Sequence, residues 1–289
     1  MPFFLAIASA VFYGSADFIG GVVSRRVAAI PVVIISQAAG LLLVGLLLPL
    51  FPAASPTPAD FWWGAAAGLA GGTGVALLYH ALAIGTMSVV APTTAVAAVA
   101  IPVVASIALG ERPGSLVIVG ILLGIGAIVL VSQQSTTTGE SIDGPSSPER
   151  AHRSLGVGTA LGAGVAIGLF LLTLAQTRAS AGLWPLVTMR SVSVTLMSVV
   201  GLARHSSLRM PRRLGALTVA GGLLDMLANA LYMVAAQIGP LSPVVTLSSL
   251  YPASTVLLAR FTLGERLNAW QTAGVACALI AVILIVGGH

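Results

Sequence analysis

The sequence contains no lysine and few charged residues of any kind. All 13 basic residues are arginine, and charged residues make up only 7% of the 289 residues. A soluble globular domain carries roughly 25% charged residues to cover its surface. Here hydrophobic residues reach 57%, and the mean hydropathy is +1.03. These values exclude an ordinary soluble protein and indicate that most of the surface faces a lipid bilayer.

Several kinds of chemical site are also missing from the sequence. Cys277 is the only cysteine, which excludes an intramolecular disulfide and a cysteine metal cluster. The arginines are dispersed and have no interleaved aromatic residues, so we expect no nucleic-acid partner. We find no phosphate-binding loop, no metal-ligand cluster and no nucleophile with a matching base. We therefore predict that the protein is not an enzyme and needs no cofactor.

What the sequence does contain is a series of long apolar segments. A helix that crosses the hydrocarbon core of a membrane needs about 20 mostly apolar residues. Ten segments meet this requirement, five on each side of a polar stretch at residues 133–154. That stretch cannot bury enough apolar area to fold, so we predict a flexible linker. The ten segments cover residues 3–23, 30–50, 62–82, 88–109, 114–132, 155–175, 184–203, 213–236, 242–263 and 268–287.

The two sets of five segments read as copies of one unit. The sequence Leu-Gly-Glu-Arg at 109–112 recurs at 263–266, which is 154 positions later, and isolated glycines, prolines and serines recur at the same offset. Because five is an odd number, the second copy must enter the membrane upside down. We therefore predict an all-α integral membrane protein of ten transmembrane helices, arranged as two inverted five-helix repeats. The predicted units are residues 1–132, the linker 133–154, and residues 155–289.

Small residues and prolines add two local predictions. Gly68 and Gly72 have the spacing that lets a neighbouring helix approach closely. Two segments of the pattern, the fourth and the ninth, contain paired prolines at 92 and 102 and at 243 and 252. Proline inside a spanning helix frees backbone carbonyls and bends the helix. We expect these two segments to bend around a cavity.

Together these features resemble a known group of proteins. The residues that carry the resemblance are the two Leu-Gly-Glu-Arg turns, the glycine that follows each (Gly120 and Gly274), Tyr13-Gly14-Ser15, and Leu250-Tyr251-Pro252. With them the chain resembles the drug/metabolite transporter superfamily, in its ten-helix form with two EamA-type repeats. The resemblance covers all but the linker, and it says almost nothing about the substrate. The family usually has an arginine in the second segment, where this chain has Ser36-Gln37.

The orientation in the membrane is left open by two opposing indications. Arginines gather in the loops after the first, fifth, seventh and ninth segments, whereas the opposite side holds only Arg112 and Arg178. The preference of basic residues for the cytoplasmic side predicts that both termini lie outside the cytoplasm. The family resemblance implies cytoplasmic termini. Both accounts place the chain in a cell membrane, plasma or inner, as a multi-pass protein.

Ionisable residues at membrane depth are costly, so they are functional candidates. Asp17 lies in the first segment with Tyr13 one turn before it, and Asp225 lies in the eighth with Asn229 one turn later. Each neighbour shares a helix face with its aspartate. One hypothesis is that the two carboxyls bind protons or substrate cations. The other is that each forms an ion pair with Arg190 or Arg260 and holds helices together.

Further candidates come from polar residues in apolar surroundings. The remaining substrate or proton-pathway candidates are His80, Tyr232, Tyr251 and Ser248. His80 has no partner at metal-ligand spacing, the tyrosines also suit the membrane interface, and Ser248 also suits a helix contact. We expect Glu111 and Glu265 to be structural and to cap the helix that follows each of them.

The function predicted from these features is secondary transport by alternating access. The expected partner is a small organic metabolite or drug that is exported, with coupling to protons as one possibility. Uncoupled permeation of a sugar or nucleoside and a non-transporting membrane scaffold or sensor remain as alternatives. The sequence is compatible with a monomer or a homodimer.

Overall fold

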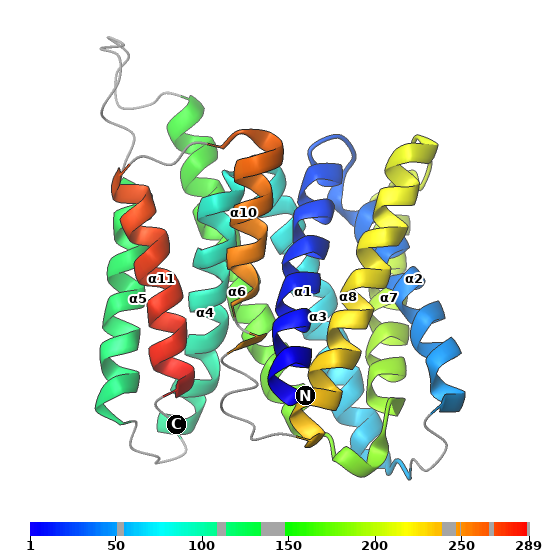
Figure 1. The fold of residues 1–289 in the computed structure, drawn as a ribbon. Coiled ribbons are helices and arrows are strands. Elements are labelled where there is room, and N and C mark those ends of the chain that lie inside the picture. The colour runs from blue at the N-terminus through cyan, green and yellow to red at the C-terminus, as the bar shows by residue number, and fades with distance from the viewer. Residues whose placement is uncertain are drawn as a thin grey trace.

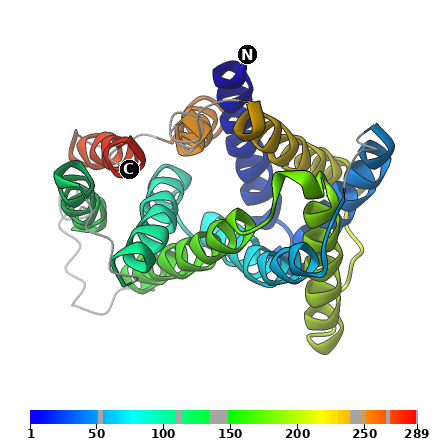
Figure 2. The same cartoon turned by 90° about the horizontal axis from the view of Figure 1, so that it is seen from below.

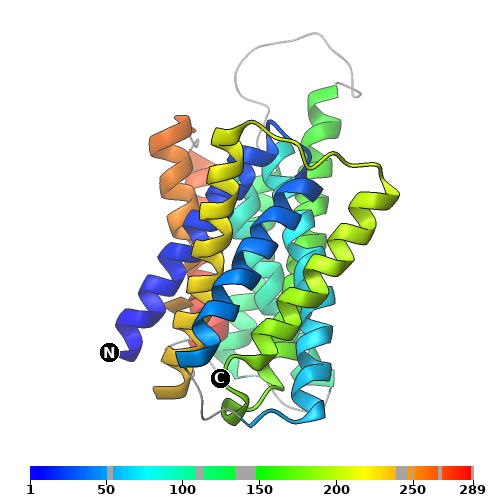
Figure 3. The same ribbon diagram turned by 90° about the vertical axis from the view of Figure 1, so that its right-hand side faces the viewer.

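The computed structural model of the chain is all-helical in the residues that it describes. Those residues are 1–50, 55–108, 114–133, 148–238, 247–248, 250–265 and 269–287. Within them no strand occurs. The helices run up and down beside one another, with both ends of the chain at the same end of the bundle (Figure 1 and Figure 3). The α-helices are α1 (Pro2–Ser24), α2 (Ala29–Leu47), α3 (Pro58–Ile84), α4 (Met87–Ala108), α5 (Ser115–Gln133), α6 (Pro148–Ala175), α7 (Trp184–Ala203), α8 (Arg212–Ile238), α10 (Tyr251–Leu263) and α11 (Ala269–Gly287).

Six of these helices are long and apolar enough to cross a membrane, when the described residues alone are searched. They are α1, α2 with the short 3-10 turn η1 (Leu48–Leu50), α3, α6, α7 and α8. The outward-facing side chains of the bundle are also apolar, for example Leu46, Leu202 and Phe261, which are 76%, 80% and 81% exposed. Apolar surface of this extent is rare on a soluble monomer. The chain is therefore a multi-pass membrane protein, as its composition predicts.

Two helix boundaries differ from the predicted segments. α6 begins at Pro148 and not near residue 155, so the last residues of the predicted linker are helical. Proline and glutamate at 148–149 favour a first helical turn, because that turn needs no proline N–H and has a positive dipole end. The rest of the linker, from residue 134 to 147, lies outside the described residues.

The second difference lies in the ninth predicted segment, residues 242–263. A turn at Leu250 precedes α10, and α10 itself starts at Tyr251 with Pro252 in its first turn. Proline is well suited to the start of a helix but not to its interior. The predicted segment is therefore not one continuous helix, since it is interrupted beside Leu250. Pro243 lies outside the described residues.

Glycines set the closest helix contacts. Gly64, Gly68 and Gly72 lie along α7, which confirms the predicted small-residue face of α3. A Cβ atom added at Gly68 would stand 2.4 Å from the carbonyl oxygen of Met189, and one at Gly222 of α8 would stand 2.1 Å from that of Ser36 in α2. Any side chain at these positions would push the helix backbones apart.

The close contacts recur at the repeat offset. Gly14 of α1 lies against Thr255 of α10, and Gly168 of α6 lies against Ile101 of α4. Adding 154 to the first residue and subtracting 154 from the second converts one contact into the other. Figure 1 further shows that α1 starts at the end of the bundle that holds the N-terminus, whereas α6 starts at the opposite end. Contacts between the halves are thus reciprocal, and these two equivalent helices run in opposite directions.

At the end of the bundle that holds the termini, an ion pair joins the two halves. Asp60 near the start of α3 accepts hydrogen bonds from the backbone and side chain of Thr57 and from the backbone and guanidinium of Arg178. Its carboxyl is 2.9 Å from Arg178 Nη2.

Seen from below, α5 and α11 form a separate pair at one edge of the bundle, away from α2 and α7 (Figure 2).

We predict that Gly222→Ala destabilises the folded protein, because its methyl group would collide with the Ser36 carbonyl. Overpacking of this kind costs roughly 1–3 kcal/mol. The matched control is Gly45→Ala in α2, whose added Cβ would meet nothing within 4 Å. Thermal unfolding in detergent should show a lower midpoint for Gly222→Ala and an equal or higher midpoint for Gly45→Ala. Equal midpoints for the two variants would contradict the close α2–α8 contact.

Candidate functional site

A cavity of about 140 Å³ lies between the helices near the middle of the bundle. It is partly open to the outside, and its lining is mostly apolar. Side chains reach it from α1, α2, α3, α4, α6, α7, α8 and α10, so both halves of the chain contribute to it. A cavity with a mostly apolar wall and a few convergent polar groups is the usual form of a small-molecule site.

The structure brings eight of the nine candidate residues together at this cavity. They are Tyr13, Asp17, Arg190, Asp225, Asn229, Tyr232, Ser248 and Tyr251. The ninth, His80, is exposed on α3 and is not among the lining residues. Its neighbour Tyr79 is the buried one of the two.

The crossing of α1 and α10 forms one corner of the cavity. Gly14 lets the two helices approach, and Thr255 Oγ1 donates a 3.0 Å hydrogen bond to the Gly14 carbonyl. This crossing places the rings of Tyr13 and Tyr251 edge to face, with centroids 6.3 Å apart and an interplanar angle of 63°. Asp17 follows Tyr13 by one turn of α1, so its carboxyl lies on the same wall.

A second corner is built from α2, α7 and α8. Arg190 of α7 is 4% exposed, and its guanidinium donates to Gln37 Oε1 of α2 and to Asp225 Oδ2 of α8. The contact between Gly222 and Ser36 holds α2 and α8 close enough for this arrangement. Asp225 therefore forms the ion pair with Arg190 that one of its two hypotheses predicts. Gln37 is not among the predicted site residues, because glutamine has no charge that must be explained at membrane depth.

Asp17 differs from Asp225 in having no partner. Among the described residues, its carboxyl makes no hydrogen bond and no ion pair. Its side chain is half-buried and is reached from the cavity. Within the same wall, the hydroxyl of Tyr251 is buried and also has no hydrogen-bond partner. An unpaired carboxyl and an unpaired hydroxyl in an apolar cavity leave polar groups for a ligand to satisfy.

The remaining candidates make contacts between or along helices. Asn229 Nδ2 donates to the Asp225 carbonyl one turn earlier, at 2.8 Å. Ser248 Oγ lies 3.4 Å from the carbonyl of Ala6, and the ring of Tyr232 packs against the same part of α1. Both Ser248 and Tyr232 thus help to hold the first half against the second while lining the cavity.

Polar and apolar side chains line the cavity from different helices, and they occupy equivalent positions of the two repeats. Five pairs of lining residues are related by the offset of 154, and in all of them the polar member comes from α1 or α8 and the small or apolar member from α3 or α6. The pairs are Tyr13 and Ile167, Asp17 and Leu171, Gly71 and Asp225, Val75 and Asn229, and Leu78 and Tyr232. Equivalent positions of the two copies thus meet at one cavity, yet they carry different chemistry.

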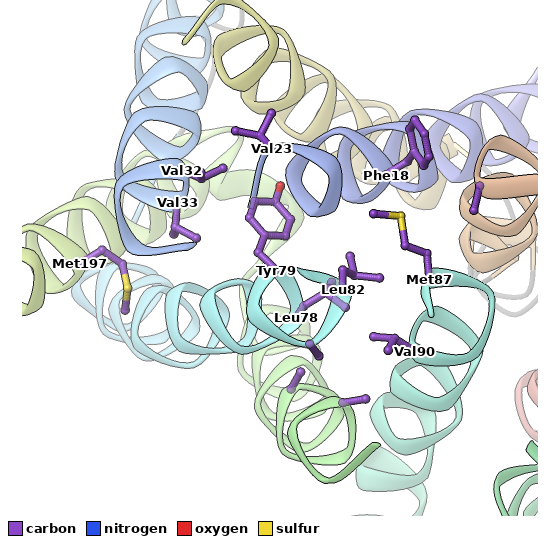
Figure 4. Close-up of a cluster of buried hydrophobic side chains, with 14 of the residues drawn as sticks. Phe18, Val23, Val32, Val33, Leu78, Tyr79, Leu82, Met87, Val90 and Met197 are labelled. Atoms are coloured by element: carbon purple, nitrogen blue, oxygen red, sulfur yellow. The ribbon is translucent and has the colours of Figure 1, made fainter. Parts of the chain in front are cut away.

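Toward the end of the bundle away from the N-terminus, a layer of buried side chains fills the space between α1, α3 and α4, and we call this the sealed end (Figure 4). The ring of Tyr79 lies directly over Gly20, where an added Cβ would be only 2.1 Å from the ring, and Leu82 and Met87 lie against Gly21. Tyr79, Leu82 and Met87 are each 3% exposed or less. This layer closes α1 against α3 and α4 toward the end of the bundle away from the N-terminus.

Polar contacts of Glu265 join the two halves at the same end. Glu265 accepts hydrogen bonds from the backbone N–H groups of Met87 and Ser88 and from Ser88 Oγ, and it forms a 3.1 Å ion pair with Arg25. The prediction that Glu265 caps the helix following it is wrong, because it caps α4 in the other half. The local sequence pattern could not reveal a helix start 178 residues away. Glu111 lies outside the described residues.

We predict that Arg190 and Asp225 stabilise the fold only as a pair. Asp225→Asn leaves a buried guanidinium without its carboxylate, a change that costs roughly 3–5 kcal/mol. The double variant Arg190→Gln with Asp225→Asn removes both charges and should unfold at a higher temperature than Asp225→Asn alone. A double variant less stable than either single variant would contradict the pairing.

Comparisons with known proteins agree with this architecture. A profile of the EamA-like transporter family matches residues 1–133 and again residues 154–287. Eighteen solved chains share the fold; one, titled "Crystal structure of protein", has 15% sequence identity and a TM-score of 0.63, and the match covers 96% of this chain and 94% of that one. No curated protein matched the sequence. In the described residues, no group of three or more histidine, cysteine, aspartate or glutamate side chains could hold a metal ion. Because the family profile matches both halves, the chain belongs to the EamA-like transporter family.

Proposed function

We propose that the protein is a secondary transporter that moves a small organic solute through the central cavity by alternating access. The observation that carries this proposal is the cavity itself, which is lined by equivalent positions of the two halves and holds an unpaired carboxyl. A family of membrane transporters for small solutes provides the context. In such proteins the substrate site commonly lies where two repeats meet near the middle of the membrane.

The proposal includes ten membrane-spanning helices in two inverted five-helix repeats. The reciprocal contacts of Gly14 with Thr255 and of Gly168 with Ile101 support it, since they are what a two-fold relation between the halves requires. The opposite directions of α1 and α6 support it as well. We further propose that residues 1–132 and 155–289 act as the two moving units.

An asymmetry between the halves supports alternating access. α1 packs against α3 at the sealed end, through Gly20 and Tyr79. The equivalent helices of the second half, α6 and α8, form no comparable contact in the described residues. We infer that the cavity opens between α6 and α8 and that the opposite state closes these helices and separates α1 from α3.

We propose Asp17, and not Asp225, as the group that couples transport to protons. The charge of Asp225 is offset by Arg190, and a proton on that carboxyl would break the ion pair. Asp17 has no such partner and faces the cavity, so it can gain and lose a proton without disturbing the helix packing. The other ionisable groups that line the cavity are Arg190, Asp225 and three tyrosines, Tyr13, Tyr232 and Tyr251.

We predict that Asp17→Asn abolishes proton movement coupled to the solute. The protein would be reconstituted in liposomes with an internal pH dye and screened with amino acids, amines and drugs under two imposed pH gradients. A transported solute should change the internal pH with wild-type protein and not with Asp17→Asn. Ser15→Ala, a neighbouring change on α1 whose hydroxyl bonds only to the Val11 carbonyl, should keep the coupling.

Two results would contradict the coupling proposal. One is an Asp17→Asn variant that moves protons with the solute as wild type does. The other is wild-type solute flux that is unchanged when the pH gradient is collapsed, which would identify an uncoupled permease.

A further inference from the structure

The charges around the cavity do not balance. Arg190 contributes one positive charge and Asp225 one negative charge, and they neutralise each other in a direct ion pair. Asp17 therefore leaves one negative charge on the cavity wall when it is ionised. A charge facing an apolar cavity is stabilised by an opposite charge brought by a ligand. This favours a solute with one positive charge.

The groups beside Asp17 suit an ammonium ion in particular. The Tyr251 hydroxyl is unpartnered and offers a lone pair to an N–H donor. Tyr13 and Tyr251 also present two aromatic rings at the same corner, inclined to each other at 63°. An ammonium group within about 6 Å of a ring centroid is attracted to its face, and the attraction is larger in a desolvated site.

The opposite wall of the cavity carries no charge. Ile167, Phe170 and Leu171 of α6 line it together with Val75 and Leu78 of α3. These side chains can hold the hydrocarbon part of a solute but offer no side-chain hydrogen bond to it. The solute should therefore carry its charge at one end and an apolar body at the other.

The volume of the cavity suits a small apolar body. Its volume of about 140 Å³ is below the roughly 300 Å³ at which sites for drug-sized ligands begin. The fit is to a molecule with one ring or a short branched chain.

We propose that the cavity binds a small organic ammonium ion, with the charged group at Asp17, Tyr13 and Tyr251 and the apolar body against α3 and α6. This assignment rests on the proposed transport function, because it names the class of solute for the same cavity. A cationic solute is favoured over an anionic one, because the charge of Arg190 is offset by Asp225 and its guanidinium donates to Gln37 and Asp225. The remaining donor of Arg190, Nε, is buried and has no partner.

The test is direct binding to the purified full-length protein in lipid nanodiscs, measured by calorimetry. The probes are phenyltrimethylammonium and benzenesulfonate, which have similar size, one aromatic ring and fixed opposite charges. We expect phenyltrimethylammonium to bind at least tenfold more tightly than benzenesulfonate. Asp17→Asn should weaken phenyltrimethylammonium binding by roughly 10- to 100-fold, the range for the loss of an interaction with a charged group.

Two control variants separate the charge from the fold. Asp17→Glu keeps the carboxyl and should keep the preference for the cation. Asp60→Asn removes a carboxyl that lies outside the cavity, and its affinity for the cation should match that of wild type. If Asp17→Asn does not fold, the preference of wild type and of Asp17→Glu between the two probes still decides the matter.

The assignment would be overturned by tighter binding of benzenesulfonate, or by a folded Asp17→Asn variant with unchanged affinity for the cation. Failure of the transport function gives a different pattern. Phenyltrimethylammonium that binds as expected while no solute crosses proteoliposomes would remove the transporter and leave the cation site. Neutral or anionic solutes that are transported, with no cation binding, would remove the cation site and leave the transporter.

Discussion

The arrangement of the cavity depends on the high cost of an unpaired charge in an apolar surrounding. Arg190 meets this constraint by lying between Gln37 and Asp225, where helices from both halves converge. This ion pair holds α7 against α8, and each of the two charges is offset by the other. Asp17 is the exception, and an exception to so costly a rule needs a reason in function. For this reason we centre the proposed transport on Asp17.

Duplication accounts for the shape of the cavity, and divergence accounts for its chemistry. The close contacts that position the helices, such as those of Gly14 and Gly168, recur in both copies because they serve packing. The lining residues differ between the two copies, and the position equivalent to Asp17 is Leu171. A symmetric scaffold thereby holds an asymmetric cavity, with a charged corner and an apolar wall. Such a cavity suits a solute that is itself charged at one end.

Local patterns predicted the helices and most of the polar side chains that line the cavity, but not the pairing of side chains. Apolar length, the repeat and the spacing of Gly68 and Gly72 are properties of neighbouring residues, and they led to the observed fold. The rule for ionisable groups at membrane depth pointed to Asp17 and Asp225 alike. Which of them meets Arg190 depends on how α7 and α8 cross, and the partner of Glu265 depends on contact between the halves. His80 was selected for its chemistry, although its helix face directs it away from the cavity.

The central claim is that the two ends of the cavity open in turn. It is tested most directly by spin-label distances in a Cys277→Ser background, with one label pair at residues 26 and 80 and the other at residues 176 and 238. The first pair reports on α1 and α3 at the sealed end, and the second on α6 and α8, between which we infer that the cavity opens. Alternating access predicts that changing the pH or adding a transported solute lengthens the first distance while shortening the second. Distances that stay fixed under every condition, or that lengthen and shorten together, would contradict it.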